Sequence, residues 1–357
     1  GILGKDKEEP RATRNIPEVI KHIQGLIDKG YAYITESGVY FSVRKFKDYG
    51  KLSGQTVDQM LTGVRKETDE TKNDPLDFAL WKISKPGEPR WQSPWGEGRP
   101  GWHIECSVMS RKFLKADTLD IHAGGLDLVF PHHENEVAQS EALTGKPFAK
   151  YWIHHGLLTI NGQKMSKSLG NFITIKDFAK DKDTDLLKLF FLSVHYSQPI
   201  DFTAEKIEEC KKQKKSLGDF FEKADLTTKS KTLPKFSKHD KNKIDAICDK
   251  FEQSMDNDFN MPQALGHLFE LRDLAFGFTA GAYKYARKRM EVFFNIFGLK
   301  IKPQLKLPSR VIKEQAEREK SKKEGNYKRA DDIRSGWAKE FGLRSNDTSF
   351  GVTITRI

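Results

Sequence analysis

The stretch GWHIECSVMSRKFLKADTLDIHAGGLDLVFPHHENE, residues 101–136, decides the fold class of this chain. Its pattern predicts a helix that starts near Trp102 and a short buried strand over residues 118–122. A second helix is expected to open at Pro131, because proline is favoured in the first turn of a helix. Helix, strand and helix therefore follow one another in close succession.

The residues after this stretch continue the alternation. Residues 151–154 and 157–160 have the apolar character of strands, and Asn161-Gly162 is a tight-turn sequence. Residues 101–165 thus alternate helix and strand as one half of a doubly wound α/β domain does. The expected fold is α/β, with a partial nucleotide-binding domain of this kind.

Three side chains of the central stretch have the chemistry of a metal site. His132 and Glu136 are four residues apart on the expected helix, so both project from one face. Cys106 comes from the preceding helix and can meet them only through folding. Thiolate, imidazole and carboxylate together suit Zn²⁺ and leave a fourth position for another protein ligand, water or substrate. Taken singly, a cysteine fits a buried apolar position and a histidine a helix-start hydrogen bond, so the combination carries the hypothesis.

A glycine pair ends the expected strand. The sequence HAGGLD, residues 122–127, lies at the strand's carboxyl end, where open α/β sheets bind ligands. Gly124 and Gly125 let the backbone approach a nucleotide closely, and Asp127 can accept hydrogen bonds from ribose hydroxyls. Most glycine pairs are only turns, so the position of this pair matters more than its composition.

A lysine-rich loop, KMSKSLGN over residues 164–171, follows the tight turn. Lys164 and Lys167 flank a serine and can reach several phosphate oxygens as mobile point charges. Such charges stabilise a leaving pyrophosphate. Charged loops are usually only solvated, but this order of residues after such a fold favours polyphosphate binding.

The composition narrows the class of protein. The 357 residues carry a formal net charge of +11, which suits a polyanionic partner but serves solubility equally well. Three cysteines, Cys106, Cys210 and Cys248, exclude a disulfide scaffold and suit a reducing cytosol. No apolar run approaches the length of a membrane span, and the start has no signal-peptide pattern. We expect a cytoplasmic protein with no membrane partner.

Together these motifs resemble a known family. GWHIECS at 101–107, FPHHENE at 130–136 and the lysine-rich loop are similar to motifs of cysteinyl-tRNA synthetase, a class I aminoacyl-tRNA synthetase. The similarity covers essentially the whole chain, with further matching segments EPRAT at 9–13, DFALWK at 77–82, MDNDFNMP at 255–262 and YKRADDIR at 327–334.

The resemblance implies a role for each candidate residue around the amino acid. The zinc ligands would be Cys106, His132 and Glu136, and the bound zinc would take the thiolate of L-cysteine directly. The side chains lining the cysteine pocket would be Trp102 and His122. The second histidine of the FPHHENE motif, His133, would be structural.

The resemblance also implies how ATP and tRNA would be held. Gly124, Gly125 and Asp127 would contact the nucleotide, and Lys164 and Lys167 would act on the phosphates of ATP, which binds with Mg²⁺. We expect four parts: a connective insertion region, 1–100; the second half of the catalytic domain with the lysine-rich loop, 101–200; a tRNA-binding helical bundle, 201–302; and a small C-terminal domain on the anticodon side, 303–357. Phosphate contacts to tRNA(Cys) are expected from two groups of basic residues: Lys211, Lys212, Lys214 and Lys215 in the bundle, and Lys320, Lys322, Lys323, Lys328 and Arg329 in the tail.

Two departures from the family's pattern stand out. Ala123 takes the place of a glycine usual in the family's glycine run. The family's N-terminal segment, with a first zinc-ligating cysteine and an ATP-binding His-Ile-Gly-His signature, does not occur in these residues. We therefore expect a fragment or one of two polypeptides, inactive alone and completed by a separate N-terminal segment.

The function implied by the resemblance is that of a cysteine–tRNA ligase, which activates L-cysteine with ATP and transfers it to tRNA(Cys). One alternative is the related ligase that joins cysteine to an amino sugar in thiol-cofactor synthesis, which shares the zinc and lysine-loop motifs. The tail from residue 309 argues against that reading. A second alternative, from another class, is a non-catalytic tRNA-binding fragment.

Overall fold

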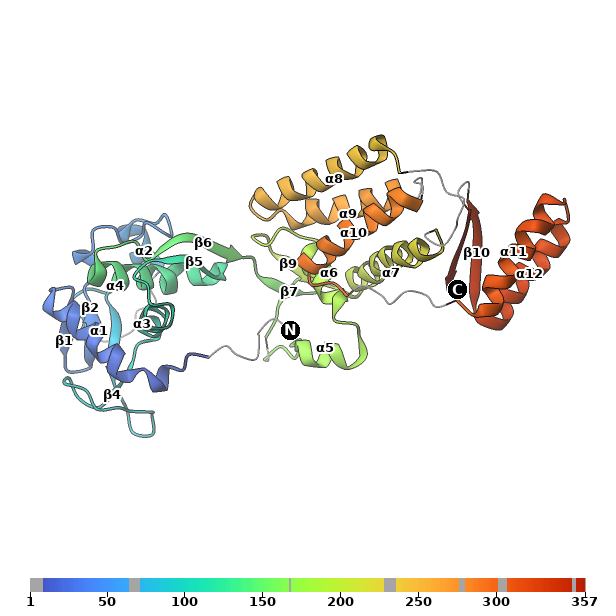
Figure 1. Ribbon diagram of the computed structural model, residues 1–357. Helices are drawn as coiled ribbons and strands as arrows, with labels where there is room; N and C mark the ends of the chain where they lie inside the picture. Colours follow the sequence, from blue (N-terminus) through green and yellow to red (C-terminus); the bar gives the residue numbers. More distant parts are fainter. Residues whose placement is uncertain are drawn as a thin grey trace. The chain divides into compact units, whose positions relative to one another are not determined.

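The computed structural model describes residues 9–63, 71–166, 168–227, 236–275, 280–300, 307–348 and 351–356 (Figure 1). The chain forms two compact units, residues 1–157 and 158–357. The boundaries expected at residues 100, 200 and 302 stay predictions.

The first unit opens with a helix and a hairpin. Helix α1 (Ile16–Asp28) has a proline in its first turn and buries apolar side chains at helical spacing. Gly30, at φ 80°, ends it as the sequence predicts. Residues 31–34 and 39–43 read as two apolar strands joined at Glu36-Ser37-Gly38, which predicts a hairpin. Strands β1 (Ala32–Thr35) and β2 (Gly38–Phe41) pair antiparallel and confirm it.

This hairpin extends into a four-stranded antiparallel sheet in the order β1-β2-β3-β4. The apolar run 78–83 predicts strand β3 (Phe78–Ile83), whereas β4 (Gly98–Pro100) lies in the Pro-, Gly- and Trp-rich segment 85–101, which the sequence predicts to be a loop. The polar residues 50–75 predict irregular structure, and helix α2 (Val57–Gly63) corrects that expectation. The sheet packs with α1 around one apolar core, which includes Ile23, Leu80 and Trp81.

The central stretch folds as a βαβ unit. Strands β5 and β6 are parallel neighbours, with His122 opposite Trp152 and Gly124 opposite His154. A π-type turn over Val129–His133 comes before α4, so the regular helix begins three residues later than Pro131. The elements of this unit are α3 (Trp102–Leu114), β5 (Leu119–Gly125), η3 (Leu126–Leu128), η4 (Val129–His133), α4 (Glu134–Thr144) and β6 (Ala149–His155).

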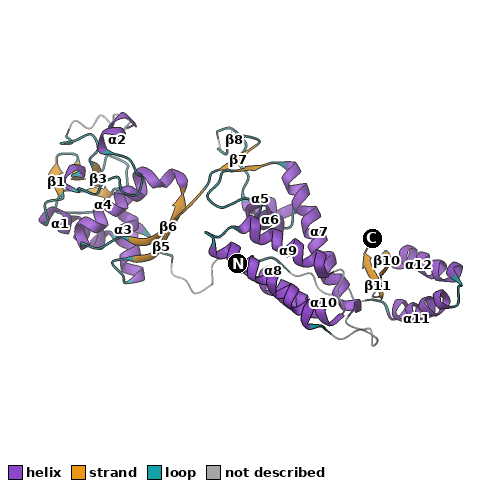
Figure 2. Cartoon of the chain, turned by 90° about the horizontal axis from the view of Figure 1, so that it is seen from above, coloured by secondary structure: helices purple, strands orange, loops and turns teal. Residues whose placement is uncertain are grey.

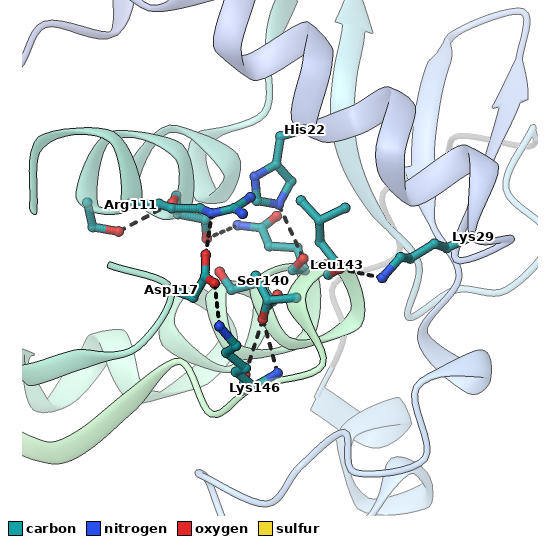
Figure 3. A network of polar contacts seen from close by, with 11 residues as sticks. His22, Lys29, Arg111, Asp117, Ser140, Leu143 and Lys146 are labelled. Atoms are coloured by element: carbon teal, nitrogen blue, oxygen red, sulfur yellow. Dashed lines mark hydrogen bonds and ion pairs between the residues drawn. The ribbon is translucent and has the colours of Figure 1, made fainter. Parts of the chain in front are cut away.

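Polar contacts tie the helices of this unit together (Figure 3). The ring Nε2 of buried His22 on α1 lies 3.3 Å from the carbonyl oxygen of Gln139 on α4. Arg111 Nε donates to Asp117 Oδ1 at 2.7 Å, and Lys146 Nζ donates to the other oxygen of the same carboxylate at 2.8 Å. The first contact joins α1 to α4, and the two contacts of Asp117 join the last turn of α3 to the segment after α4.

The second unit begins with a small sheet in the order β8-β7-β9. The turn between β7 and β8 places Asn161 at φ 50° and Gly162 at φ 74°, as a two-residue hairpin turn requires. The elements are β7 (Leu158–Ile160), β8 (Gln163–Lys164), α5 (Ile175–Asp181), α6 (Asp185–Leu192) and β9 (Ile200–Phe202).

Four longer helices follow and pack on α6 through a large apolar core (Figure 2). They are α7 (Ala204–Thr227), α8 (Lys238–Asp256), α9 (Met261–Ala275) and α10 (Ala280–Ile296). The expected bundle is therefore present. In the described part of the chain, no helix is both long and apolar enough to cross a bilayer.

The tail has a core of its own. Val311, Ile333, Trp337, Leu343 and Ile354 are buried together. The elements are α11 (Ser309–Lys323), α12 (Tyr327–Phe341), β10 (Leu343–Thr348) and β11 (Gly351–Arg356), the two strands forming an antiparallel pair. The sequence predicts helices over residues 311–324 and 327–341 and a short strand pair near residues 352–354, and the structure confirms these elements.

Candidate metal and nucleotide site

The structure brings together the three side chains expected to bind metal. The ligand atoms of Cys106 on α3, His132 on η4 and Glu136 on α4 all lie within 4.8 Å of one another. His132 is 4% exposed and Glu136 is fully buried. A soft sulfur, an imidazole and a carboxylate thus converge in the interior of the first unit.

The carboxylate of Glu136 is an unusual buried anion. His132 Nε2 lies 2.9 Å from its Oε1 and His122 Nε2 lies 2.7 Å from its Oε2. Beyond these two imidazole contacts, both oxygens lack a hydrogen-bond partner among the described residues. Burial raises the pKa of Glu136, but the two imidazoles outweigh burial and hold the pKa at about 2. An ionised carboxylate with open lone pairs is therefore available to a cation.

The raised pKa of the Cys106 thiol also indicates a cation site. Burial, and then the negative charge of Glu136, raise the pKa of Cys106 to about 12. Without a positive charge this group stays a thiol at neutral pH, whereas a bound metal requires and stabilises the thiolate. The donor set of sulfur, nitrogen and oxygen therefore fits Zn²⁺.

A second trio shares the same carboxylate. The ligand atoms of His122, His133 and Glu136 also lie within 4.8 Å of one another. His133 Nδ1 is 2.8 Å from His154 Nε2, so the cluster continues to the end of β6. Sequence analysis treated His133 as structural and missed His154, although the end of a parallel strand is a usual ligand position.

Two expected pocket residues flank this cluster. Trp102 is 59% exposed, and its ring lies 4.2 Å from the ring of His132 between centroids. His122 packs edge-on against Trp152 at 4.9 Å and contacts Glu136 as described. Trp102 thus covers His132 from the solvent side, and His122 faces the opposite oxygen of the carboxylate.

The glycine pair has a packing role that the sequence did not reveal. A Cβ on Gly124 would lie 2.6 Å from Cε1 of His133, and a Cβ on Gly125 would lie 2.4 Å from Oδ1 of Asp127. Gly124 therefore makes room for the buried ring of His133, whereas the exposed side chain of Asp127 could move away from a Cβ at position 125. Asp127 itself is exposed at the end of β5, which leaves its carboxylate accessible to a ligand.

The lysine-rich loop belongs to the second unit. Lys164 ends β8 and is exposed, whereas Lys167 lies outside the described residues. The side chain of Asn171 holds the loop at two points, donating to Lys164 O at 3.1 Å and accepting from Ser166 N at 2.9 Å. Asn171 therefore supports the backbone of the lysine-rich loop, a role that the sequence alone did not indicate.

Comparison with known proteins identifies the class. A family of class I tRNA synthetase catalytic domains, type C, matches residues 3–212, and a DALR domain matches residues 250–301. The methionyl-tRNA synthetase of Mycobacterium tuberculosis has a similar fold, with a TM-score of 0.58 at 15% identity over 81% of this chain and 72% of that one. A putative arginyl-tRNA synthetase of Campylobacter jejuni has a TM-score of 0.54 at 14% identity, over 84% of this chain and 65% of that one. The fold is that of a class I aminoacyl-tRNA synthetase with a helical DALR domain.

Sequence relatives narrow the class further. A cysteine–tRNA ligase of Sulfurihydrogenibium is 48% identical over 373 residues, covering 96% of this chain and 76% of that relative. The cysteine–tRNA ligase of Carboxydothermus hydrogenoformans is 45% identical over 98% of this chain and 76% of its own length. The cysteine–tRNA ligase of Persephonella marina is 57% identical over 74% of this chain and 54% of its own length. The chain belongs to the cysteine–tRNA ligase family.

Proposed function

We propose that this chain supplies the amino-acid-selecting and phosphate-binding parts of a cysteine–tRNA ligase. The reaction joins L-cysteine to ATP as cysteinyl-adenylate and then transfers cysteine to tRNA(Cys). The observation that supports this most is the convergence of Cys106, His132 and Glu136 within 4.8 Å, in a chain of this family.

Cysteine selection is assigned to the metal cluster. Cys106, His132 and Glu136 would hold zinc, because the buried oxygens of Glu136 have no hydrogen-bond partner beyond the two imidazoles in the described part and the Cys106 thiol needs a nearby cation to ionise. Zinc, when bound, supplies a soft Lewis acid that prefers a thiolate to the hydroxyl of serine. Trp102 shields this position from water, and His122 faces the second oxygen of Glu136.

Contacts to the nucleotide are assigned to each unit separately, to the end of β5 in the first and to the lysine-rich loop in the second. Asp127 would accept hydrogen bonds from the ribose, and the backbone of Gly124 and Gly125 would lie along the nucleotide. Lys164 and Lys167 would neutralise charge on the phosphates of ATP as pyrophosphate leaves, together with Mg²⁺. Asn171 would keep the backbone of this loop in position.

The helical bundle and the tail would bind tRNA. Lys212 and Lys215 on α7, and Lys323 and Lys328 on α11 and α12, are exposed and suited to phosphate contacts. Lys214 does not belong to this set, because its Nζ lies 2.9 Å from the buried carboxylate of Asp185. A cytoplasmic location is part of this proposal.

A further segment is proposed to complete the catalytic domain. Within the described residues β5 and β6 form a two-stranded parallel sheet, and parallel sheets are normally covered on both faces. Ile121 on β5 and Tyr151 on β6 are instead exposed. Further strands and helices, on an N-terminal segment carrying the remaining ATP-binding groups, would cover this face, and the chain alone would be inactive.

Metal analysis tests the central assignment. The purified chain should hold about one zinc, and Cys106→Ala should lose it, whereas Cys248→Ala should not, since Cys248 is a free cysteine buried in the bundle. Equal zinc in Cys106→Ala and the parent would remove the basis of the proposal. Cysteine-dependent pyrophosphate exchange should be absent from the chain alone and appear when the N-terminal segment is added.

A further inference from the structure

The imidazole of His103 contacts the imidazole of the candidate metal ligand His132 through a ring nitrogen. The two Nδ1 atoms are 2.8 Å apart, on α3 and η4 respectively. The ring centroids are 4.9 Å apart and the planes are tilted by 55°. The Nδ1–Nδ1 distance is that of a short nitrogen–nitrogen hydrogen bond, so one nitrogen must carry a proton and the other must present a lone pair.

Metal binding decides which nitrogen carries that proton. His132 turns Nε2 toward Glu136, 2.9 Å from Oε1, so Nε2 is the nitrogen that faces the metal cluster. An imidazole that binds metal through Nε2 uses the lone pair there and keeps its proton on Nδ1. The Nδ1 atom of His132 must then donate, and the Nδ1 atom of His103 must accept.

The backbone and surroundings of His103 hold it in place for this role. Gln139 Nε2 donates to the carbonyl oxygen of His103 at 2.6 Å and to Ser107 Oγ at 2.7 Å. Gln139 itself is fully buried on α4. The ring of Phe78 meets the His103 ring edge-on, 5.8 Å between centroids and 88° between planes. The acceptor is therefore positioned before any metal arrives.

We propose that His103 is a positioning residue for the metal site, which accepts the Nδ1 proton of His132 and so fixes His132 in the tautomer that offers Nε2 to zinc. The inference rests on the zinc site of the proposed function. Outer hydrogen bonds of this kind strengthen metal binding by about 10- to 100-fold. His103 does not touch the metal or the substrate in this role.

Asparagine and leucine at position 103 separate this role from simple packing. The amide oxygen of an asparagine occupies nearly the same place as Nδ1 of a histidine and accepts a hydrogen bond. Leucine fills a similar space and accepts none. His103→Asn should therefore keep the metal affinity, whereas His103→Leu should lose it. His22→Leu serves as the control, because His22 is a buried histidine whose ring contacts the carbonyl oxygen of Gln139 rather than a metal ligand.

The experiment is a titration of the metal-free chain with Co²⁺, followed by the sulfur-to-cobalt charge-transfer band of Cys106. The parent, His103→Asn and His22→Leu should bind Co²⁺ with similar affinity. His103→Leu should bind 10- to 100-fold more weakly. Folding of each variant is checked by circular dichroism.

Each outcome is decisive. Similar affinity and spectrum for the parent and His103→Leu would overturn the positioning role while leaving the zinc site intact. No charge-transfer band in the parent would overturn the zinc site itself. Equal losses in His103→Asn and a folded His103→Leu would also overturn the proposed acceptor role.

A second measurement covers the case in which His103→Leu does not fold. Long-range ¹H–¹⁵N correlation on the zinc-loaded parent reports which ring nitrogen of each histidine is protonated. The proposal requires a protonated Nδ1 in His132 and an unprotonated Nδ1 in His103. The reverse assignment would overturn it.

Discussion

Glu134 and Glu136 are both fully buried in α4, yet within the described part of the chain Glu134 accepts hydrogen bonds from the backbone, whereas Glu136 contacts only imidazole nitrogens. The carboxylate of Glu134 accepts from Gly50 N and Ser53 N, each at 2.8 Å. Two acids separated by one residue therefore have different tasks. Glu134 anchors the loop after β2 to the helix, and Glu136 keeps its lone pairs for a cation.

Conservative substitutions should separate these tasks. Glu136→Gln should lose zinc, because a neutral amide is a much weaker metal ligand than a carboxylate, while the metal-free chain still folds. Glu134→Gln should keep zinc but lower the unfolding free energy by about 2 kcal/mol, because a backbone donor loses its charged acceptor. Metal content and urea unfolding of both variants check this. Zinc loss in Glu134→Gln alone would contradict the assignment.

His22 should make the first unit sensitive to acid. Burial, opposed by the Gln139 carbonyl and aided by Arg111, lowers the pKa of His22 to about 4. The imidazole stays neutral in the folded chain down to about pH 4, whereas in the unfolded chain it gains a proton near pH 6.5. Its contribution to the unfolding free energy is therefore complete above pH 6.5 and is lost as the pH falls from 6.5 to 4.

At pH 4 the protonation of His22 in the unfolded chain should lower the unfolding free energy by about 3 kcal/mol. The difference between the parent and His22→Leu isolates it, because the other buried histidines are common to both. Unfolding followed by tryptophan fluorescence at pH 7 and pH 4 gives the comparison. A difference between the two proteins that does not change with pH would show that His22 does not carry this dependence.

Some of this architecture follows from local sequence. The spacing of Ile16, Val19 and Ile23 marks α1, and Asn161-Gly162 marks a hairpin, because both signals depend on neighbouring residues only. Helix α2 was missed because it has only seven residues, too few for a clear helical spacing of apolar side chains. The convergence of Cys106 on the helix of Glu136 was inferred from ligand chemistry.

Contacts across the fold were not predictable in the same way. The His103–His132 and His133–His154 pairs depend on how η4 is set against α3 and on the parallel register of β5 and β6. Lys214 resembles its neighbours in sequence, yet it pairs with Asp185. A single sequence does not distinguish a solvated lysine from a paired one.

Asn171 should matter for ATP chemistry although it carries no charge. In the completed enzyme, Asn171→Ala removes both bonds that hold the lysine-rich loop, at Lys164 O and Ser166 N. We expect pyrophosphate exchange to slow by about 10-fold or more, as misplacement of a charged group does, with the KM for cysteine unchanged. Lys164→Ala and Lys167→Ala should slow the same step by about 100-fold. An effect of Asn171→Ala confined to the KM for cysteine would refute the loop's assignment.

Arg318 and Asp347 hold the tail together. The Arg318 guanidinium is 1% exposed and donates to both oxygens of Asp347, at 2.8 and 2.7 Å. Asp347→Asn should destabilise the tail by about 1–2 kcal/mol, because Arg318 loses its charged acceptor while the exposed side of the pair stays open to water. Lys322→Met is the control, since Lys322 contacts the same carboxylate at 2.9 Å from a more exposed position. Limited proteolysis of the tail should distinguish the two variants, and equal resistance would argue against this ion pair.

Basic side chains on the tail should contribute to tRNA affinity through charge alone. Lys323 and Lys328 are exposed, whereas Arg329 pairs with Glu317 at 2.7 Å. Replacing Lys323 and Lys328 by glutamate should weaken binding of tRNA(Cys) and make its salt dependence shallower by roughly two ions, because each phosphate contact releases about one counterion. The double arginine variant keeps both charges and should bind as the parent does. Filter binding at several salt concentrations measures both quantities, and a glutamate variant with unchanged affinity and slope would show that these lysines only keep the surface soluble.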